Sequence, residues 1–198
     1  KLIERHLWVG RFWRYCYTAN ELLPGGGVHS FSVVGNDSGD DVDRYGIFNN
    51  TIAALEFTEQ EDKRGRSFLA DMGLDATDKF VCLVNRDPAY KTRFQSHIKA
   101  DWEYHSYRNS SIDSYALAVE ALVERGYWVF RMGKCADERL AVESPRVVDY
   151  PFCDYVSDFL DIWLMANAFF TVSSGTGLDT VSTVYRRPVV YVDYVPIG

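Results

Sequence analysis

Short apolar runs alternate with helical stretches along the last two-thirds of the chain. Five runs are almost unbroken, and they lie at residues 80–84, 127–132, 147–150, 169–173 and 189–195. Such runs are typical of strands that are buried on both faces. Helical periodicity is found between them, at 112–124, 158–168 and 178–185. This order predicts an α/β fold with a Rossmann-like, mainly parallel sheet and helices on both of its faces.

The first third of the chain has a different pattern. Residues 1–23 mix aromatic and basic side chains at helical spacing, and Pro24 and three glycines follow, so a helix is expected to end there. A strand is expected at 28–34 and a polar loop at 35–46. Thr58 and Glu61 have the spacing of a capping box, which predicts a helix that ends near Gly73.

The change of pattern near residue 74 divides the chain into an N-terminal region, 1–74, and a Rossmann-like domain, 75–198. The chain stops just after its last predicted strand, where an open α/β sheet normally continues into a covering helix. The second domain is therefore expected to be truncated at its C-terminal end.

The composition indicates a globular protein that does not bind nucleic acid. Of the 198 residues, 47% are hydrophobic and 25% are charged, which is the composition of a globular protein. The net charge of −7 argues against a nucleic-acid partner, because that partner requires clustered cations. Four cysteines without C-x-x-C spacing favour free thiols in the cytoplasm.

No run reaches the roughly 18–20 apolar residues of a membrane span. The expected location is therefore the cytoplasm. Residues 1–23 fit two interpretations: they pack against a core or a neighbouring domain, or they attach the protein peripherally to the inner membrane.

In a parallel sheet, ligands bind beyond the carboxyl ends of the strands, so the residues that follow each strand are the most informative. The run at 169–173 ends in a loop of small residues that opens a helix, and its candidate phosphate-binding residues are Ser173, Ser174, Gly175, Thr176, Gly177 and Asp179. Backbone N–H groups at such a place suit a phosphate or diphosphate. The same residues also suit a tight strand-to-helix turn.

The loop after the run at 80–84 contains Arg86 and Asp87. An arginine there can bind a diphosphate bidentately, and Asp87 can orient it or act on an acceptor hydroxyl group. A surface ion pair beside a proline turn is the alternative. Arg108 and Arg131 are predicted to bring more positive charge to the same edge of the sheet.

Three further aspartates, Asp149, Asp158 and Asp161, are candidates for hydroxyl or ribose contacts, with helix capping and solvation as alternatives. The four histidines lack metal-ligand spacing, and the chain has no G-x-S-x-G sequence. We therefore predict no metal site, and no cofactor besides a substrate.

Several stretches in combination resemble a known family. They are FVCLVNRDPAY, YHSYRNSSIDSYALAVEALVERGYWVFRMGK, VVDY and SDFLDIWLMANAFFTVSSGTGLDTVSTVYRRPVVYVDYVPIG. The family consists of bacterial GT-B-type glycosyltransferases that are associated with surface-polysaccharide genes and are distantly similar to fucosyltransferases. The resemblance covers residues 57–198, and residues 1–56 match weakly.

The resemblance implies two Rossmann-like domains that face a cleft, with the hydroxyl acceptor, such as a glycan, on the N-terminal one and the nucleotide-sugar donor on the C-terminal one. Region 1–74 would then be part of the acceptor domain or a linker. Arg86 would bind the donor pyrophosphate, and residues 173–177 would hold phosphate or ribose. Arg108, Arg131 and Asp179 are further donor-site residues on this basis.

Fucosyltransferase-like members have a histidine two places before the strand-end arginine, but this chain has Val84 there. The role of that histidine cannot be transferred, so Asp87 is the candidate base, and the donor sugar stays open. Arginine and backbone N–H groups can stabilise a departing diphosphate, so metal-independent transfer is expected.

Two other functions compete with this interpretation. A nucleotide-sugar epimerase or hydrolase of similar fold would need no acceptor. A non-catalytic domain would bind a nucleotide or a sugar without turnover. A nicotinamide enzyme is less favoured, because the residues after the first strand of the sheet, 85–90, lack the required glycines.

Overall fold

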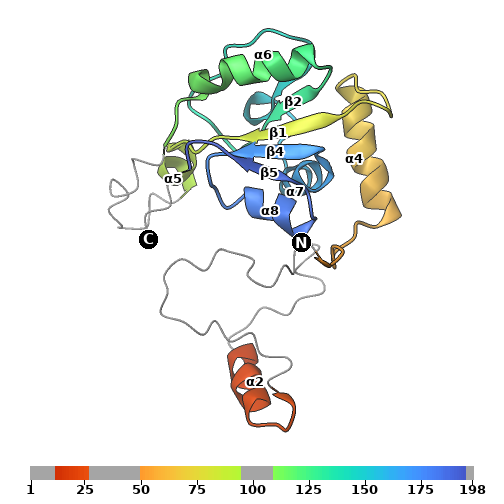
Figure 1. The fold of residues 1–198 in the computed structure, drawn as a ribbon, viewed down its shortest axis with the longest axis vertical. Coiled ribbons are helices and arrows are strands. Elements are labelled where there is room, and N and C mark those ends of the chain that lie inside the picture. Colours follow the sequence, from red (N-terminus) through yellow and green to blue (C-terminus); the bar gives the residue numbers. More distant parts are fainter. Residues whose placement is uncertain (1–11, 27–49, 95–108, 195–198) are drawn as a thin grey trace. The chain divides into compact units, whose positions relative to one another are not determined.

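The computed structural model describes residues 12–26, 50–94 and 109–194 (Figure 1). The chain divides into two compact units, one of residues 1–42 together with 198 and one of residues 43–197. In the first unit, helix α2 spans Phe12–Glu21, inside the helix that the sequence predicts. The predicted strand at 28–34 and loop at 35–46 lie outside the described residues.

The second unit is built on a five-stranded parallel sheet with the order β3-β2-β1-β4-β5 (Figure 1). Its strands are β1 (Phe80–Val84), β2 (Trp128–Arg131), β3 (Val147–Asp149), β4 (Phe170–Ser173) and β5 (Val189–Tyr191). All four pairings are parallel. The predicted α/β class and the position of every predicted strand from residue 80 onward are confirmed, although β5 is shorter than expected.

Helices cover both faces of this sheet. One face is covered by α4 (Glu59–Asp71) and α7 (Asp158–Asn167), and α8 (Asp179–Val184) packs beside α7. The other face is covered by the 3-10 helix η3 (Ile112–Tyr115) and by α6 (Ala116–Glu124). Two short elements were not predicted, the helix α5 (Ala89–Phe94) and the 3-10 helix η4 (Tyr150–Phe152).

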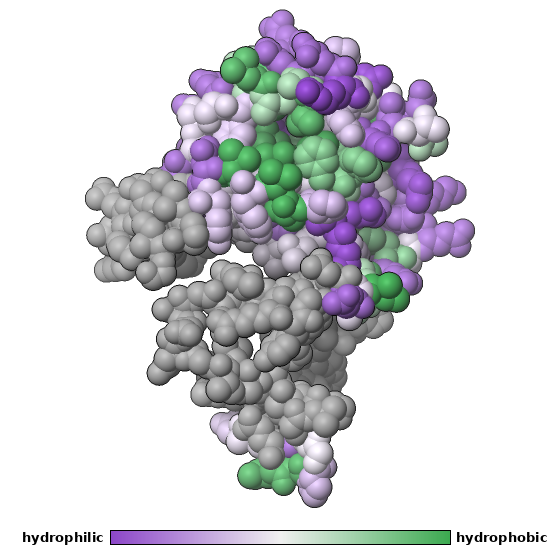
Figure 2. Space-filling model, viewed as in Figure 1, coloured by the Kyte–Doolittle hydropathy of each residue, from purple (hydrophilic) through white to green (hydrophobic). Residues whose placement is uncertain are grey.

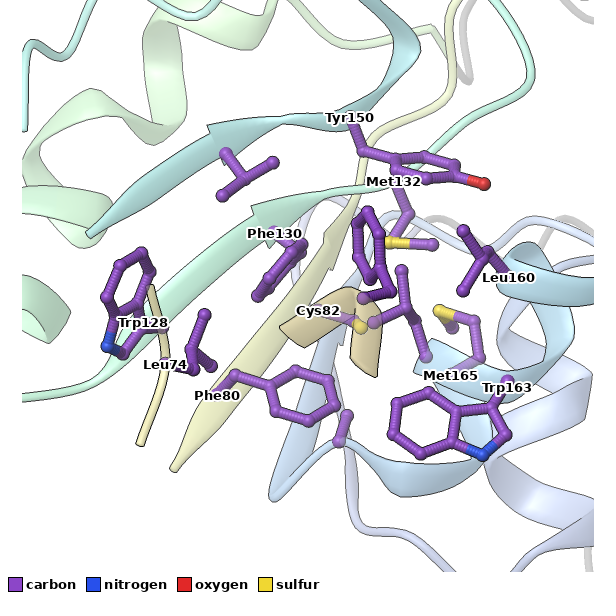
Figure 3. Close-up of a cluster of buried hydrophobic side chains, with 14 of the residues drawn as sticks. Leu74, Phe80, Cys82, Trp128, Phe130, Met132, Tyr150, Leu160, Trp163 and Met165 are labelled. Carbon is purple, nitrogen blue, oxygen red and sulfur yellow. The ribbon is translucent and has the colours of Figure 1, made fainter. Parts of the chain in front are cut away.

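The core lies in two layers because alternate residues of a strand point to opposite faces. Phe80 and Cys82 of β1 pack with Trp163 and Met165 of α7, as Figure 3 shows. Leu83 belongs to the smaller cluster on the other face. All five residues of β1 are buried, which is why this strand is an unbroken apolar run in the sequence.

Helix α4 belongs to the sheet unit. Its Phe68 is buried in the core beside Phe130, and the Nε1 of Trp163 on α7 donates to Asp62 at 3.1 Å. The compact unit therefore begins before the boundary near residue 74 that the sequence pattern suggested. The helix is mostly hydrophilic on the side that Figure 2 shows, because its other side packs on the core.

The capping box predicted at the start of α4 is present. Thr58 Oγ1 accepts from the Glu61 N–H at 3.4 Å, and the Glu61 carboxylate accepts from the Thr58 N–H at 2.9 Å. We expect Thr58→Ala to lower the free energy of unfolding by about 1 kcal/mol in urea denaturation, because it removes an N-cap acceptor. Thr58→Ser keeps that oxygen and should retain most of the stability. An equal loss in both variants would contradict this account.

Candidate functional site

The strand order places a topological switch point between β1 and β4. From β1 the chain proceeds to β2 and β3 on one side, and it then returns to β4 on the other side of β1. Loops that leave the carboxyl ends of two such strands diverge, and the crevice between them is where open α/β sheets bind ligands. Both loops that the sequence singled out begin at this point.

Two hydrogen bonds join these loops. The Ser174 N–H donates to the Val84 carbonyl oxygen at 3.1 Å, and the Arg86 N–H donates to Ser174 Oγ at 2.8 Å. On the other side, the Arg86 carbonyl oxygen accepts from the Ser110 N–H at 3.1 Å. The backbone of Arg86 is therefore held from two directions at the switch point.

A cavity of about 580 Å³ opens at this edge of the sheet. This volume lies within the usual range for small-molecule sites. The loops after β1, β2 and β4 and the first turn of α7 line it, and they contribute Arg86, Asp87, Arg131, Lys134, Asp158, Asp161, Thr176 and Gly177. The structure thus brings about half of the predicted site residues to one cavity; Ser173, Ser174, Gly175, Asp149 and Asp179 do not line it. A hollow of about 650 Å³ lies against α4, but it contains none of them.

The loop after β4 has an internal scaffold. Asp179 is only 4% exposed, and its carboxylate accepts from Ser173 Oγ at 2.5 Å and from the Thr176 N–H at 2.9 Å. Ser173 Oγ also accepts from the Gly175 N–H at 3.0 Å. Asp179, Ser173 and Gly175 therefore shape the loop from inside. The predicted ligand contacts of these three residues have no support in this geometry.

The outer part of the same loop faces the cavity. Thr176 and Gly177 line it, and a Cβ built on Gly177 would meet no atom within 4 Å. This open space permits a ligand to approach the backbone. The loop opens α8, which has only six residues, so fewer peptide dipoles add to its N-terminal field than in a long helix.

Arg131 lines the cavity, but its guanidinium group is paired with carboxylates of the protein itself. The side chain is 2% exposed, and its guanidinium lies 3.2 Å from Asp149 Oδ1 and 3.7 Å from Asp87 Oδ2. It also donates to the Glu138 carbonyl oxygen. Sequence reasoning expected this positive charge at the sheet edge but missed that Asp87 and Asp149 would neutralise it.

Asp87 is held at both carboxylate oxygens. Oδ1 accepts from the Ala89 N–H at 2.6 Å, where α5 begins, and Oδ2 accepts from the Asp137 N–H at 3.3 Å and faces Arg131. These contacts explain why α5 starts where the sequence suggested only a loop, because an aspartate that binds the N–H two residues later nucleates a turn. They favour a scaffold role for Asp87.

The first turn of α7 adds two aspartates with opposite surroundings. Asp158 is exposed, and its Oδ1 accepts from Lys134 Nζ at 2.9 Å, which lowers the pKa of Asp158 and raises that of Lys134. Asp161 is half-buried, and burial raises the pKa of its carboxyl group. Its Oδ1 is buried and, within the part of the chain that the structure describes, has no hydrogen-bond partner.

The remaining predictions concern one more arginine, the cysteines, metal binding and membrane spans. Arg108 lies outside the described residues. All four cysteines are free. Over residues 12–26, 50–94 and 109–194, no three His, Cys, Asp or Glu side chains are grouped closely enough to hold a metal ion. No helix within these ranges has both the length and the apolar character needed to cross a membrane.

The chemistry of the cavity is therefore defined by a few side chains of this chain. Arg86, Arg131 and Lys134 are its cations, of which Arg131 is paired with Asp87 and Asp149 and Lys134 with Asp158, and Thr176 and Gly177 form its open rim. Comparison of the chain with protein-family models, with curated proteins and with solved structures finds no match.

Proposed function

We propose that this chain binds the diphosphate of a nucleotide sugar in the cavity at the strand ends and forms the donor-binding part of a glycosyltransferase. The observation that carries the proposal is the position of Arg86. Its backbone is tied to the loop after β4 at the switch point, and the residue lines the cavity. A guanidinium in that place suits the planar, bidentate recognition of a phosphate group.

The other walls of the cavity suit the rest of such a ligand. Gly177 leaves open space at the rim, so a phosphate or a ribose can approach the backbone closely. Lys134, which follows β2, also lines the cavity and brings a second cation to it, paired in this structure with the exposed Asp158. Asp158 and Asp161, which also line the cavity, offer acceptors for ribose or sugar hydroxyl groups.

The chemical step then consists of moving a sugar from the nucleotide to a hydroxyl group of a glycan or another acceptor. Negative charge develops on the diphosphate as the bond from the sugar breaks, and a preorganised cation is most effective where that charge appears. Arg86 meets this requirement without a metal ion, so transfer in the presence of EDTA is part of the proposal.

Nucleotide-dependent thermal stabilisation tests the donor site. We expect one of GDP, UDP, dTDP and ADP to stabilise the protein, by about 2.7 kcal/mol at 100 times its dissociation constant, with CMP, which lacks a diphosphate, as a comparison. Arg86→Ala should abolish this shift because it removes the phosphate contact. Arg125→Ala is the matched control, since Arg125 is exposed just after α6, and it should leave the shift unchanged.

Stabilisation that persists in Arg86→Ala would refute the assigned role of this arginine. The lack of any shift in well-folded wild-type protein would refute the donor site itself. Nucleotide binding without transfer or hydrolysis, in protein supplied with acceptor glycans, would instead favour a non-catalytic binding domain.

A further inference from the structure

The three aspartates that line the cavity differ in their hydrogen-bond and ion-pair partners. Asp87 is engaged at both oxygens by Arg131 and by backbone N–H groups. Asp158 is exposed and paired with Lys134. Asp161 has a buried Oδ1 that accepts no hydrogen bond from any described residue. A buried carboxylate oxygen without a partner is costly, so it calls for a functional explanation.

The position of Asp161 follows from how α7 begins. Ser157 caps the helix, and its main chain is fixed by the fully buried Tyr150, whose hydroxyl oxygen accepts from the Ser157 N–H at 2.9 Å. Asp161 lies one turn later, where its own N–H donates to the Ser157 carbonyl oxygen at 2.9 Å. Because α7 runs antiparallel to β4, this first turn lies at the carboxyl edge of the sheet and borders the cavity.

We propose that Asp161 is the catalytic base of this site and accepts the proton of the acceptor hydroxyl group. The inference rests on the proposed function. As the acceptor oxygen bonds to the anomeric carbon of the donor sugar, its proton passes to the Asp161 carboxylate. The bond from the anomeric carbon to the diphosphate breaks, and its electron pair leaves with the nucleoside diphosphate, which faces Arg86.

The groups around Asp161 suit this task. Burial raises the pKa of its carboxyl group most; hydrogen bonding between the carboxyl group and the Tyr150 hydroxyl lowers it, nearby Asp158 raises it, and Lys134 lowers it. A raised pKa makes the carboxylate a better proton acceptor near neutral pH. Asp158, one turn earlier, has a lowered pKa because of Lys134. Two carboxyl groups that neighbouring charges and burial push in opposite directions are a common arrangement in acid–base sites.

The raised pKa also predicts the sign of a stability effect. The folded protein holds the Asp161 proton more tightly than the unfolded chain, so stability falls as pH rises from the ordinary aspartate range through the raised value. Above that window the ionised group opposes folding. Asp161→Asn should therefore be at least as stable as wild type at pH 7, which separates a loss of activity from a loss of fold.

The test compares Asp161→Asn with wild type and with Asp154→Asn, an exposed aspartate outside this cavity. The probe is the nucleotide sugar whose nucleoside diphosphate stabilises the protein, and turnover is followed as transfer or as hydrolysis by water. We expect Asp161→Asn to reduce kcat by about 100-fold or more. The Kd of the nucleoside diphosphate should change by less than about threefold, because Arg86 is intact. The acidic limb of the kcat/KM profile should disappear.

Turnover of Asp161→Asn within about threefold of wild type would overturn the inference while nucleotide binding persists. If the wild type binds none of the nucleotides, the proposed function is refuted instead. Nucleotide binding without any turnover by the wild type, in the presence of acceptor glycans, would also overturn the inference, because a non-catalytic domain needs no base.

Discussion

Replacement of Arg131 by methionine should lower the free energy of unfolding by about 3–5 kcal/mol, because it leaves two largely buried carboxylates without their cation. The side chains of Asp87 and Asp149 are only 15% and 16% exposed. Urea denaturation measures the effect. The exposed Arg125 is the matched control, and Arg125→Met should change stability by less than about 0.5 kcal/mol.

The cluster can be tested further by removing its negative charges as well. Arg131→Met combined with Asp87→Asn and Asp149→Asn should recover part of the lost stability, since the penalty comes from uncompensated buried charge. A single Arg131→Met variant within about 1 kcal/mol of wild type would mean that the two carboxylates are solvated well enough to need no partner.

Trp163→Ala should have an effect of similar size, about 3–5 kcal/mol, because a large aromatic side chain leaves a cavity that the core cannot fill. Trp163 is 2% exposed and lies where α7 meets α4. Its Nε1 donates to Asp62 at 3.1 Å, so its removal also breaks a contact between the two helices. Denaturant unfolding monitored by circular dichroism gives the difference in stability.

The effect of Gly65→Ala on stability should change sign when Trp163 is removed. A Cβ at Gly65 would lie 2.1 Å from Trp163 Cδ2, so Gly65→Ala should destabilise the wild-type protein by about 1–3 kcal/mol. In the Trp163→Ala background that clash is gone, and Gly65→Ala should stabilise the protein by about 1 kcal/mol through helix propensity. If Gly65→Ala changes stability in the same direction in both backgrounds, the Trp163 ring does not restrict the size of the side chain at residue 65.

Much of the fold of the sheet unit was predictable because its signals are local. The buried run at 80–84 and the helical period at 112–124 needed only neighbouring residues, and both elements are present. The cap at Thr58 is also local, since its partner Glu61 is three residues away. The short helix α5 was missed although its start is also local, since Asp87 accepts from the N–H of Ala89 two residues later; its six residues are too few to show a helical period.

The residue types at the candidate site were also predictable, because ligand-binding groups follow strands in parallel sheets. Arg86, Thr176 and Gly177 were expected at the carboxyl edge, and they line the cavity there. Arg131, Asp179 and Ser173 were expected to face a ligand as well, but their polar atoms are engaged inside the protein.

Local patterns in the chain were thus sufficient for the class of fold, the order of its strands and helices along the chain, and the edge at which polar residues gather. They were not sufficient to separate ligand-facing residues from internal partners. That distinction depends on pairs far apart in the sequence, such as Arg131 with Asp87, and Arg86 with Ser174. Burial and hydrogen-bond partners arise only when the strands have packed side by side, which is why Asp161 was one of three equal candidates in the sequence and is distinct in the folded protein.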